Sequence, residues 1–270
     1  MPGVYDIGYK GVGAYSFVDI EGSGENSTII RTKYAIGFGG TIYNAEIRQL
    51  RIEVIGDGTF DTCYGMRIFS NDSRYDLSFE NNPLAAGRLT NVTVYITGCN
   101  KVNNAIDIFV KNGPVILTNV TAIAAGGIEA KAISIGGYYS SALGIPSWDF
   151  IPSFTNVTAI AQNASINYGI YVAATQPVFK NITAKAIGGD NNYGIYIDYE
   201  YSNKPIRIHH SEISASTSSV VNGVSVWTGI QPLTFITNTL LEGGPISGIG
   251  NTVCAGVVDE NYAFYPTTCP

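Results

Sequence analysis

The feature that most constrains the fold is an internal repeat built from two short elements at a nearly fixed offset. The first element reads Leu-Thr-Asn-Val-Thr at 89–93, and copies of it, exact or looser, start at residues 89, 117, 154, 179, 208 and 236. The second is an apolar stretch around Gly or Ala, as in YGIYV (168–172) and YGIYI (193–197). The offset between the two is 16 residues in the first copy and 15 in the next four, whereas the copies themselves are 25 to 37 residues apart. One structural unit with loops inserted at one place accounts for this pattern.

Units of this length with short strands, Gly-rich corners and no helical periodicity are typical of a parallel β-helix. Only 13% of the residues are charged, and Gly (31) and Tyr (18) are abundant, which favours an all-β chain. Stacked at ~4.8 Å, about eight coils would form a rod on the order of 40 Å long. We therefore predict a single-domain, right-handed, single-stranded parallel β-helix over residues 1–250. Residues 251–270 depart from the repeat and are predicted to cap the open end.

Alternation within the elements predicts which side chains face the core. In the first copy Val92 and Val94 are expected to point inward, and Thr93 and Tyr95 outward. In the second element Ile170 and its equivalents are expected to point inward. Beside them we expect an exposed column, made of Arg67, Asp107, Ser134, Tyr171, Tyr196 and Ser225. Exposed aromatic residues in this column would suit a lateral interface.

The asparagine of each first element marks a change in apolar spacing, so we place it at a bend. Stacked along the axis, these side chains would form a hydrogen-bonded ladder of Asn91, Asn119, Asn156, Asn181 and Asn238. His210 falls on the same rung of its coil. The first four are also N-x-Thr glycosylation sequons. Recurrence at one phase favours the structural ladder, and Asn26, Asn71 and Asn163 are the better candidates for glycosylation.

The charge and the cysteines of the chain limit which binding partners and which cellular compartment are expected. The net charge is −6 without any Lys/Arg cluster, which argues against nucleic acid. No apolar run reaches the roughly 20 residues of a membrane span, and the N-terminus lacks a signal-peptide pattern, so we expect a mature fragment or another export route. Four cysteines predict the disulfides Cys63–Cys99 and Cys254–Cys269 and an oxidising compartment. Free cytosolic thiols are the alternative. No zinc-type spacing occurs, and no metal site is predicted.

Two long units carry a resemblance to a known group of proteins. FTNVTAIAQNASINYGIYVAATQPV (154–178) and FKNITAKAIGGDNNYGIYIDYE (179–200) resemble the repeats of bacterial right-handed β-helix proteins with a pectin-lyase-like fold. Many of these are secreted or surface proteins, and some carry tail-fibre-like modules. NTVCAGVVDENYAFYPTTC (251–269) is similar to their closing segment. The resemblance is strong over 89–270 and weak over 17–88. It implies an extracellular, cell-surface or virion location but no particular activity.

The related β-helix enzymes suggest what catalysis would require. Pectate lyases place several carboxylates around Ca²⁺, and polygalacturonases use Asp clusters in NTD, DD, GHG and RIK motifs. None of these four motifs occurs here, and the exposed second-strand column contains a single carboxylate, Asp107. We therefore predict a non-enzymatic protein. The alternative is a polysaccharide lyase or glycoside hydrolase that uses Asp149, Asp198 and Glu200.

Two long insertions, 69–88 and 136–153, leave the repeat at the same phase and are rich in aromatic residues and carboxylates. Such mixtures suit sugar rings, because aromatic faces and hydrogen-bonding groups lie together. The predicted ligand-binding residues on this edge are Tyr138, Tyr139, Trp148, Asp149, Asp198, Tyr199, Tyr201 and Trp227. The same groups suit Ca²⁺, the one cofactor we consider, and the alternative is that the aromatics only fold the loops back.

From these features we predict an extracellular structural or adhesive module. It would self-associate as a filament or a trimer, or bind surface glycan along the long-loop edge.

Overall fold

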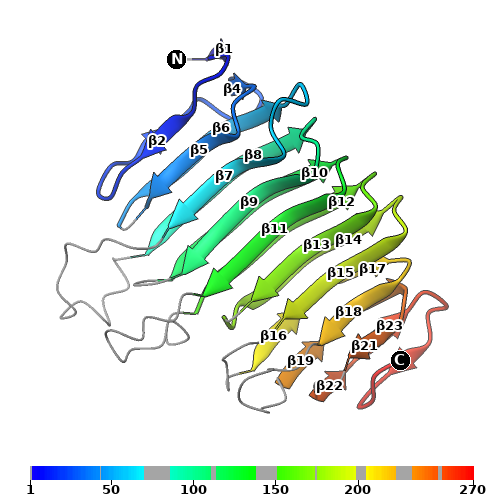
Figure 1. The fold of residues 1–270 in the computed structure, drawn as a ribbon. Coiled ribbons are helices and arrows are strands. Elements are labelled where there is room, and N and C mark those ends of the chain that lie inside the picture. Colours follow the sequence, from blue (N-terminus) through cyan, green and yellow to red (C-terminus); the bar gives the residue numbers. More distant parts are fainter. Residues whose placement is uncertain are drawn as a thin grey trace, which may run out of the picture.

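The computed structural model describes residues 2–42, 44–69, 86–110, 114–137, 151–173, 175–198, 205–222, 233–248 and 251–270. Within these ranges the chain is all-β, and consecutive coils stack along one axis to form a parallel β-helix (Figure 1). The predicted fold class is confirmed.

Two sheets run the length of the helix. The main path of the first consists of β1 (Gly3–Asp6), β4 (Thr28–Thr32), β6 (Glu46–Ile55), β8 (Gly87–Thr97), β10 (Val115–Ala125), β12 (Ser153–Gln162), β14 (Val178–Ile187), β17 (Glu212–Ala215), β20 (Leu240–Gly243), β23 (Val257–Asp259) and β24 (Phe264–Tyr265). Off this path lie β3 (Ile20–Glu21), β16 (Ile206–His209), β19 (Leu233–Thr237) and β22 (Asn251–Ala255).

In the described part of the chain the second sheet has nine strands, where the sequence indicated about eight coils. They are β2 (Val12–Ala14), β5 (Ile36–Thr41), β7 (Thr62–Phe69), β9 (Val102–Val110), β11 (Glu129–Gly137), β13 (Ile166–Ala173), β15 (Asn191–Asp198), β18 (Ser218–Asn222) and β21 (Ile246–Gly248). The second elements recognised in the sequence cover neither β2 at the N-terminal end nor β21 towards the C-terminus, where the repeat is too degenerate to recognise by its motif.

Each coil of the first sheet bends at one left-handed residue. Asn91, Asn119, Asn156 and Asn181 have φ between 53° and 56°, which asparagine tolerates better than most residues. Their amides bond from rung to rung: Asn119 Nδ2 donates to Asn91 Oδ1 (3.0 Å), Asn156 to Asn119 (3.0 Å) and Asn181 to Asn156 (2.7 Å). This row is hereafter called the asparagine ladder.

The ladder position continues with other residues at both ends. His210 (φ 49°) separates β16 from β17, and Asn238 (φ 48°) separates β19 from β20, with Asn238 Nδ2 3.3 Å from His210 Nε2. Gly256 takes the same place between β22 and β23. Towards the N-terminus Gln49 (φ 60°) is in register with Asn91, a member that the sequence motif did not indicate.

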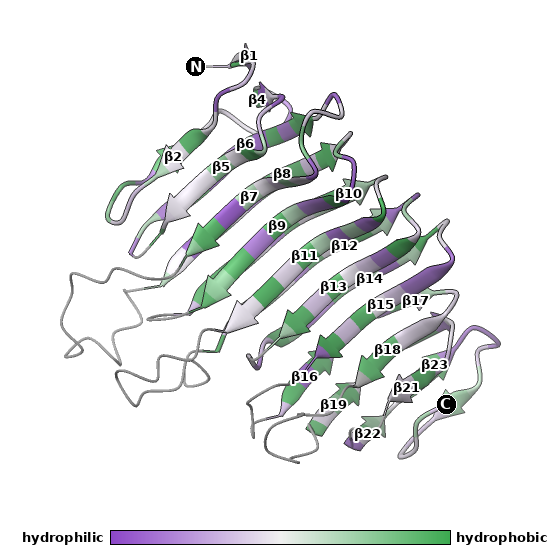
Figure 2. Ribbon diagram, in the orientation of Figure 1, coloured by the Kyte–Doolittle hydropathy of each residue, from purple (hydrophilic) through white to green (hydrophobic). Residues whose placement is uncertain are grey.

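The core lies between the sheets and is built from columns of in-register apolar residues. One fully buried column consists of Ile47, Leu89, Leu117, Phe154, Phe179, Ile208 and Ile236. Hydrophobic and hydrophilic residues alternate along the strands, which is visible as colour bands in Figure 2. Val92 and Val94 are buried as predicted.

A second set of asparagines closes the corner between the sheets. Asn103, Asn167 and Asn192 are buried, and each amide bonds both the N–H and the carbonyl of a turn residue three or four positions earlier. Asn167 Nδ2 also donates to Asn192 Oδ1 at 2.9 Å. These contacts satisfy buried polar groups that would otherwise be costly.

Both predicted disulfides are present, Cys63–Cys99 and Cys254–Cys269. The C-terminal segment differs from a simple cap over 251–270. Residues 251–259 add a further parallel rung, since β22 pairs with β19 and β23 with β20. Only β24 is antiparallel, on β23. The repeat motif did not indicate this rung, because Gly256 occupies the position at which other rungs have the ladder asparagine.

Candidate functional site

The polar and aromatic side chains on the outside of the second sheet form the most elaborate surface among the described residues. We call this surface the second-sheet face. It lies beside the edge at which β7, β11, β15 and β18 end, each followed by a stretch outside the described residues. Those strands end within two positions of each other in register. The insertions that the sequence singled out therefore start from one edge.

In β7, β11, β13 and β15 two consecutive buried residues interrupt the in–out alternation of side chains. The side chains on either side of this buried pair, three positions apart, therefore both lie on the second-sheet face. In β13 Gly169 and Ile170 are both buried, whereas Tyr168 and Tyr171 on either side of them are partly exposed. β7 has the same pattern around Gly65, so Arg67 lies on the face. Glycine is required at 169 because a Cβ there would lie 2.5 Å from the carbonyl oxygen of Gly194.

Four tyrosines form one cluster on this face. Tyr168 stacks on Tyr193 (centroids 5.3 Å apart) and Tyr171 on Tyr196 (5.6 Å), and the two stacks contact each other edge to face. Aromatic pairs prefer these offset and T-shaped arrangements. Tyr171 Oη donates a hydrogen bond to Asp198 Oδ2 at 2.8 Å. We call these five residues the tyrosine cluster.

The environment of the tyrosine cluster disfavours ionised phenols. Burial and the charge of Glu129 raise the pKa of Tyr168 to about 12. Burial and the hydrogen bond to Asp198 raise the pKa of Tyr171 well above its ordinary value, and burial raises that of Tyr196. At neutral pH the hydroxyls are therefore hydrogen-bond donors and acceptors, not bases.

Next to the tyrosines lies a small charged group. Lys131 Nζ lies 2.7 Å from Glu129 Oε1 and 4.5 Å from the ring centroid of Tyr171, a cation–π distance. On the preceding strand Asp107 lies 3.2 Å from Arg67 Nε.

Asp107 was expected to be exposed, and that expectation was wrong, because it is only 5% exposed under its neighbours. Burial raises its pKa, while the positive charge of Arg67 opposes the shift.

Arg67 is surrounded by aromatic rings. Its guanidinium carbon lies 4.4 Å from the centroid of Tyr64, 5.2 Å from that of Phe109 and 5.6 Å from that of Phe69. Phe69 and Phe109 stack at 5.1 Å. The ion pair and the rings together fix the orientation of the guanidinium.

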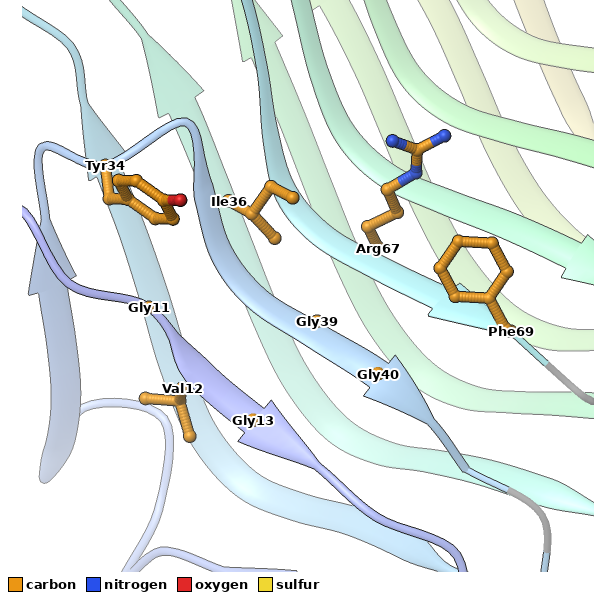
Figure 3. A pocket seen from close by; sticks show the side chains of 9 residues that line it. All are labelled: Gly11, Val12, Gly13, Tyr34, Ile36, Gly39, Gly40, Arg67 and Phe69. Atoms are coloured by element: carbon orange, nitrogen blue, oxygen red, sulfur yellow. The ribbon is translucent and has the colours of Figure 1, made fainter. Parts of the chain in front are cut away.

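At the N-terminal end of the face, beyond Arg67, the surface is hollowed. The hollow has a volume of about 310 Å³, and Figure 3 shows the residues that line it. Gly13 and Gly39 are in register with Arg67, so two successive rungs lack a side chain where β7 carries arginine. Tyr34 and Phe69 also line this space, which we call the glycine hollow.

Of the predicted ligand-binding residues, the structure places one, Asp198, in the tyrosine cluster. The others lie outside the described residues: Tyr138, Tyr139, Trp148, Asp149, Tyr199, Tyr201 and Trp227. Glu200, proposed with Asp149 for catalysis, also lies outside them. The sequence reasoning did not single out Tyr168, Tyr193, Phe69 and Phe109. A sequence signal for them was available in the second element. There a small residue is followed directly by a buried apolar residue, and this pair interrupts the alternation of buried and exposed positions.

The described residues contain no group of three or more His, Cys, Asp or Glu side chains arranged to hold a metal ion. Nor does this part of the chain contain a helix with the length and hydrophobicity of a membrane span. The second-sheet face instead offers aromatic rings, hydroxyls and paired charges, which suits binding of a polar ligand.

Comparison with models of protein families gives no match, and comparison with curated proteins gives none either. Among solved structures, the catalytic domain of a GH87 α-1,3-glucanase in complex with nigerose is matched twice. The two structures have 13% and 12% sequence identity and TM-scores of 0.30 and 0.27, and each match covers 92% of this chain. The chain spans 60% of the length of these structures.

Proposed function

We propose that this protein is a non-enzymatic, extracellular β-helix module that binds glycan along the second-sheet face. The observation that carries the proposal is the continuity of aromatic and charged side chains over five successive strands, from β7 to β15. The sheet beneath them is hydrogen-bonded on both sides of every strand, so these groups are held in place before a ligand arrives.

The chemistry of the face suits sugars. Pyranose rings present apolar C–H surfaces to aromatic rings and hydroxyls to hydrogen-bonding side chains. Lys131, Tyr171 and Asp198 offer both kinds of contact on three successive strands, β11, β13 and β15. We propose that Trp148 and the other predicted residues of the long-loop edge complete the contact.

A glycan array followed by calorimetry on the best ligand tests this proposal. Tyr171→Ala should weaken binding about tenfold or more, since it removes a ring and a hydrogen bond from the cluster. Tyr95→Ala is the matched control, because Tyr95 lies on the outside of the first sheet. Equal affinities for the two variants, or no glycan bound by the wild-type chain, would rule the proposal out.

An extracellular, surface or fibre role is the second part of the proposal, and it agrees with the resemblance to bacterial β-helix repeat proteins. Two disulfides support an oxidising compartment. Self-association is supported by β1, which pairs with one strand, β4, among those described and whose four residues are all exposed, including Val4 at 56%. Light scattering should give a mass above that of one chain, and Val4→Lys should lower it. A monomeric wild-type protein would contradict assembly and leave glycan binding standing.

The enzymatic alternative makes a different prediction. A lyase or hydrolase using Asp149, Asp198 and Glu200 would degrade acidic polysaccharides and lose turnover in Asp198→Asn. The non-enzymatic proposal expects no product from either protein. Turnover that Asp198→Asn abolishes would overturn it.

A further inference from the structure

We propose that the glycine hollow is a separate subsite for one carboxylate-bearing sugar residue, a hexuronic acid within a polysaccharide. This inference rests on the proposed glycan binding and names the ligand class at one end of the second-sheet face. The tyrosine cluster lies three to four strands away, on β13 and β15, so the two regions are tested independently.

The shape of the hollow comes from missing side chains. The outward column that carries Arg67, Asp107 and Ser134 on later rungs has glycine at 13 and 39. The space of about 310 Å³ is bounded by backbone below and by side chains from β7 and Tyr34 at its sides (Figure 3). It has the size of a small-ligand site.

Phe69 supplies a stacking surface. One face of its ring packs on Phe109 of β9, and the hollow lies on the opposite side of β7, over β5 and β2. Phe69 is 36% exposed, and its ring is backed by a second aromatic ring. A pyranose ring stacked there would bury apolar C–H surface against a rigid wall.

The positive charge of Arg67 determines which class of sugar the hollow would bind. Among the described residues that line the hollow, Arg67 is the one that carries a charge. Its counter-ion Asp107 is on the next strand, away from the hollow, and the Asp107 side chain is only 7% exposed. A ligand in the hollow therefore meets the guanidinium and not the carboxylate. A guanidinium held by an ion pair and three rings pairs well with a carboxylate, in a charge-assisted contact that a neutral sugar cannot form.

The glycines also provide a way to block the hollow without touching its ligand-binding groups. At Gly13 the atoms nearest to an added Cβ belong to the Tyr15 side chain, at 3.3 Å, and Tyr15 is 69% exposed, so it has room to shift. Gly11 and Gly40 do not serve this purpose, because a Cβ there would lie 2.4 Å and 2.1 Å from backbone oxygens. Gly13→Val is thus the informative variant, with Thr121→Val on the outside of the first sheet as its control.

The experiment is calorimetric titration of the full chain with trigalacturonate and, in parallel, with the neutral trisaccharide maltotriose. We expect trigalacturonate to bind, to lose affinity with added salt, and to bind about tenfold or more weakly to Gly13→Val and to Phe69→Ala. Arg67→Lys keeps a charge beside Asp107 and should weaken trigalacturonate binding while leaving the fold intact by circular dichroism.

Each other outcome has a definite reading. Trigalacturonate binding that Gly13→Val leaves unchanged overturns the subsite, even if Tyr171→Ala still abolishes glycan binding elsewhere. Maltotriose binding in the hollow with equal affinity overturns the assignment to an acidic sugar. Loss in the hollow variants without any loss in Tyr171→Ala would support the subsite and contradict binding along the tyrosine cluster.

Discussion

At the scale of single residues, asparagine combines two properties at the bend of the first sheet. It tolerates the left-handed backbone, and its amide both donates and accepts, so a column of identical residues satisfies itself. Asn156 shows both, with φ at 56° and hydrogen bonds to Asn119 and Asn181. These two properties can be separated by substitution, because glycine keeps only the first and alanine keeps neither.

We predict that Asn156→Gly lowers the free energy of unfolding by about 1 kcal/mol, the contribution of two exposed hydrogen bonds. Asn156→Ala should cost a further 1–2 kcal/mol, roughly the penalty of a Cβ in the left-handed region. Urea unfolding of the two variants beside the wild type measures both. Equal losses would show that backbone conformation contributes nothing at this position.

The raised pKa of Tyr168 leads to a prediction about the stability of the fold at alkaline pH. Its pKa in the folded protein is about 12, above the ordinary value of 10.0, chiefly because it is partly buried. Between these values the unfolded chain loses the proton and the folded chain retains it, so stability present below pH 10 is lost as pH rises towards 12. Tyr168→Phe should show a shallower fall of unfolding free energy with pH. Identical slopes would contradict the burial of this phenol.

At the scale of strands, the close approach of successive rungs limits residue size inside the second sheet. The equivalent position on successive strands is held by a small residue: Gly65, Ala105, Ala132, Gly169, Gly194 and Ser219. On β18 the register aligns Val221 with Tyr196, so the expected second element at 222–226, with Ser225 in the exposed column, was wrong. At Gly194 an added Cβ would lie 2.4 Å from Ile213 Cγ2 and 2.6 Å from the carbonyl oxygen of Ser219. The small residue in every second element is therefore a packing requirement.

Gly169→Ala is predicted to destabilise the protein by about 1–3 kcal/mol, because its Cβ would lie 2.5 Å from the backbone oxygen of Gly194. Ala132→Gly, one rung earlier at the equivalent position, creates no clash and should cost about 0.5–1 kcal/mol. Thermal unfolding monitored by circular dichroism compares them. A loss no larger at 169 than at 132 would mean that the rungs separate easily.

The same strands show what the sequence could predict. A fixed offset between two elements implies stacked coils, and the asparagine phase implies a ladder, since both depend only on spacing along the chain. Contacts between rungs depend in addition on how neighbouring strands align and on where the alternation of buried and exposed residues is interrupted. Spacing along the chain does not give either. Asp107 was expected to be exposed because period-2 alternation places it outside, yet Arg67 and its other neighbours cover it. Tyr168 was overlooked because two consecutive buried residues, Gly169 and Ile170, break that alternation.

At the scale of the whole molecule, the rod is a one-dimensional stack. In the described residues each central strand pairs only with strands one rung away, as β10 does with β8 and β12. The stability of such a stack is close to a sum of coil terms and nearest-neighbour interfaces. A rigid rod built this way keeps distant parts of the second-sheet face aligned, while damage at one end stays local.

This locality gives the last prediction. Leu117→Ala in β10 and Leu241→Ala in β20 each remove a buried leucine, worth about 2–5 kcal/mol. Leu241 belongs to the terminal coils, so its loss should speed amide exchange over residues 233–259 and leave β8 to β11 protected. Leu117 lies between coils on both sides, and its loss should speed exchange across the central strands. Hydrogen exchange read by mass spectrometry distinguishes the two patterns. Uniform loss of protection in Leu241→Ala would show that the coils unfold as one unit. A ligand bound at the glycine hollow would then stabilise the C-terminal rungs as strongly as the rungs that it contacts.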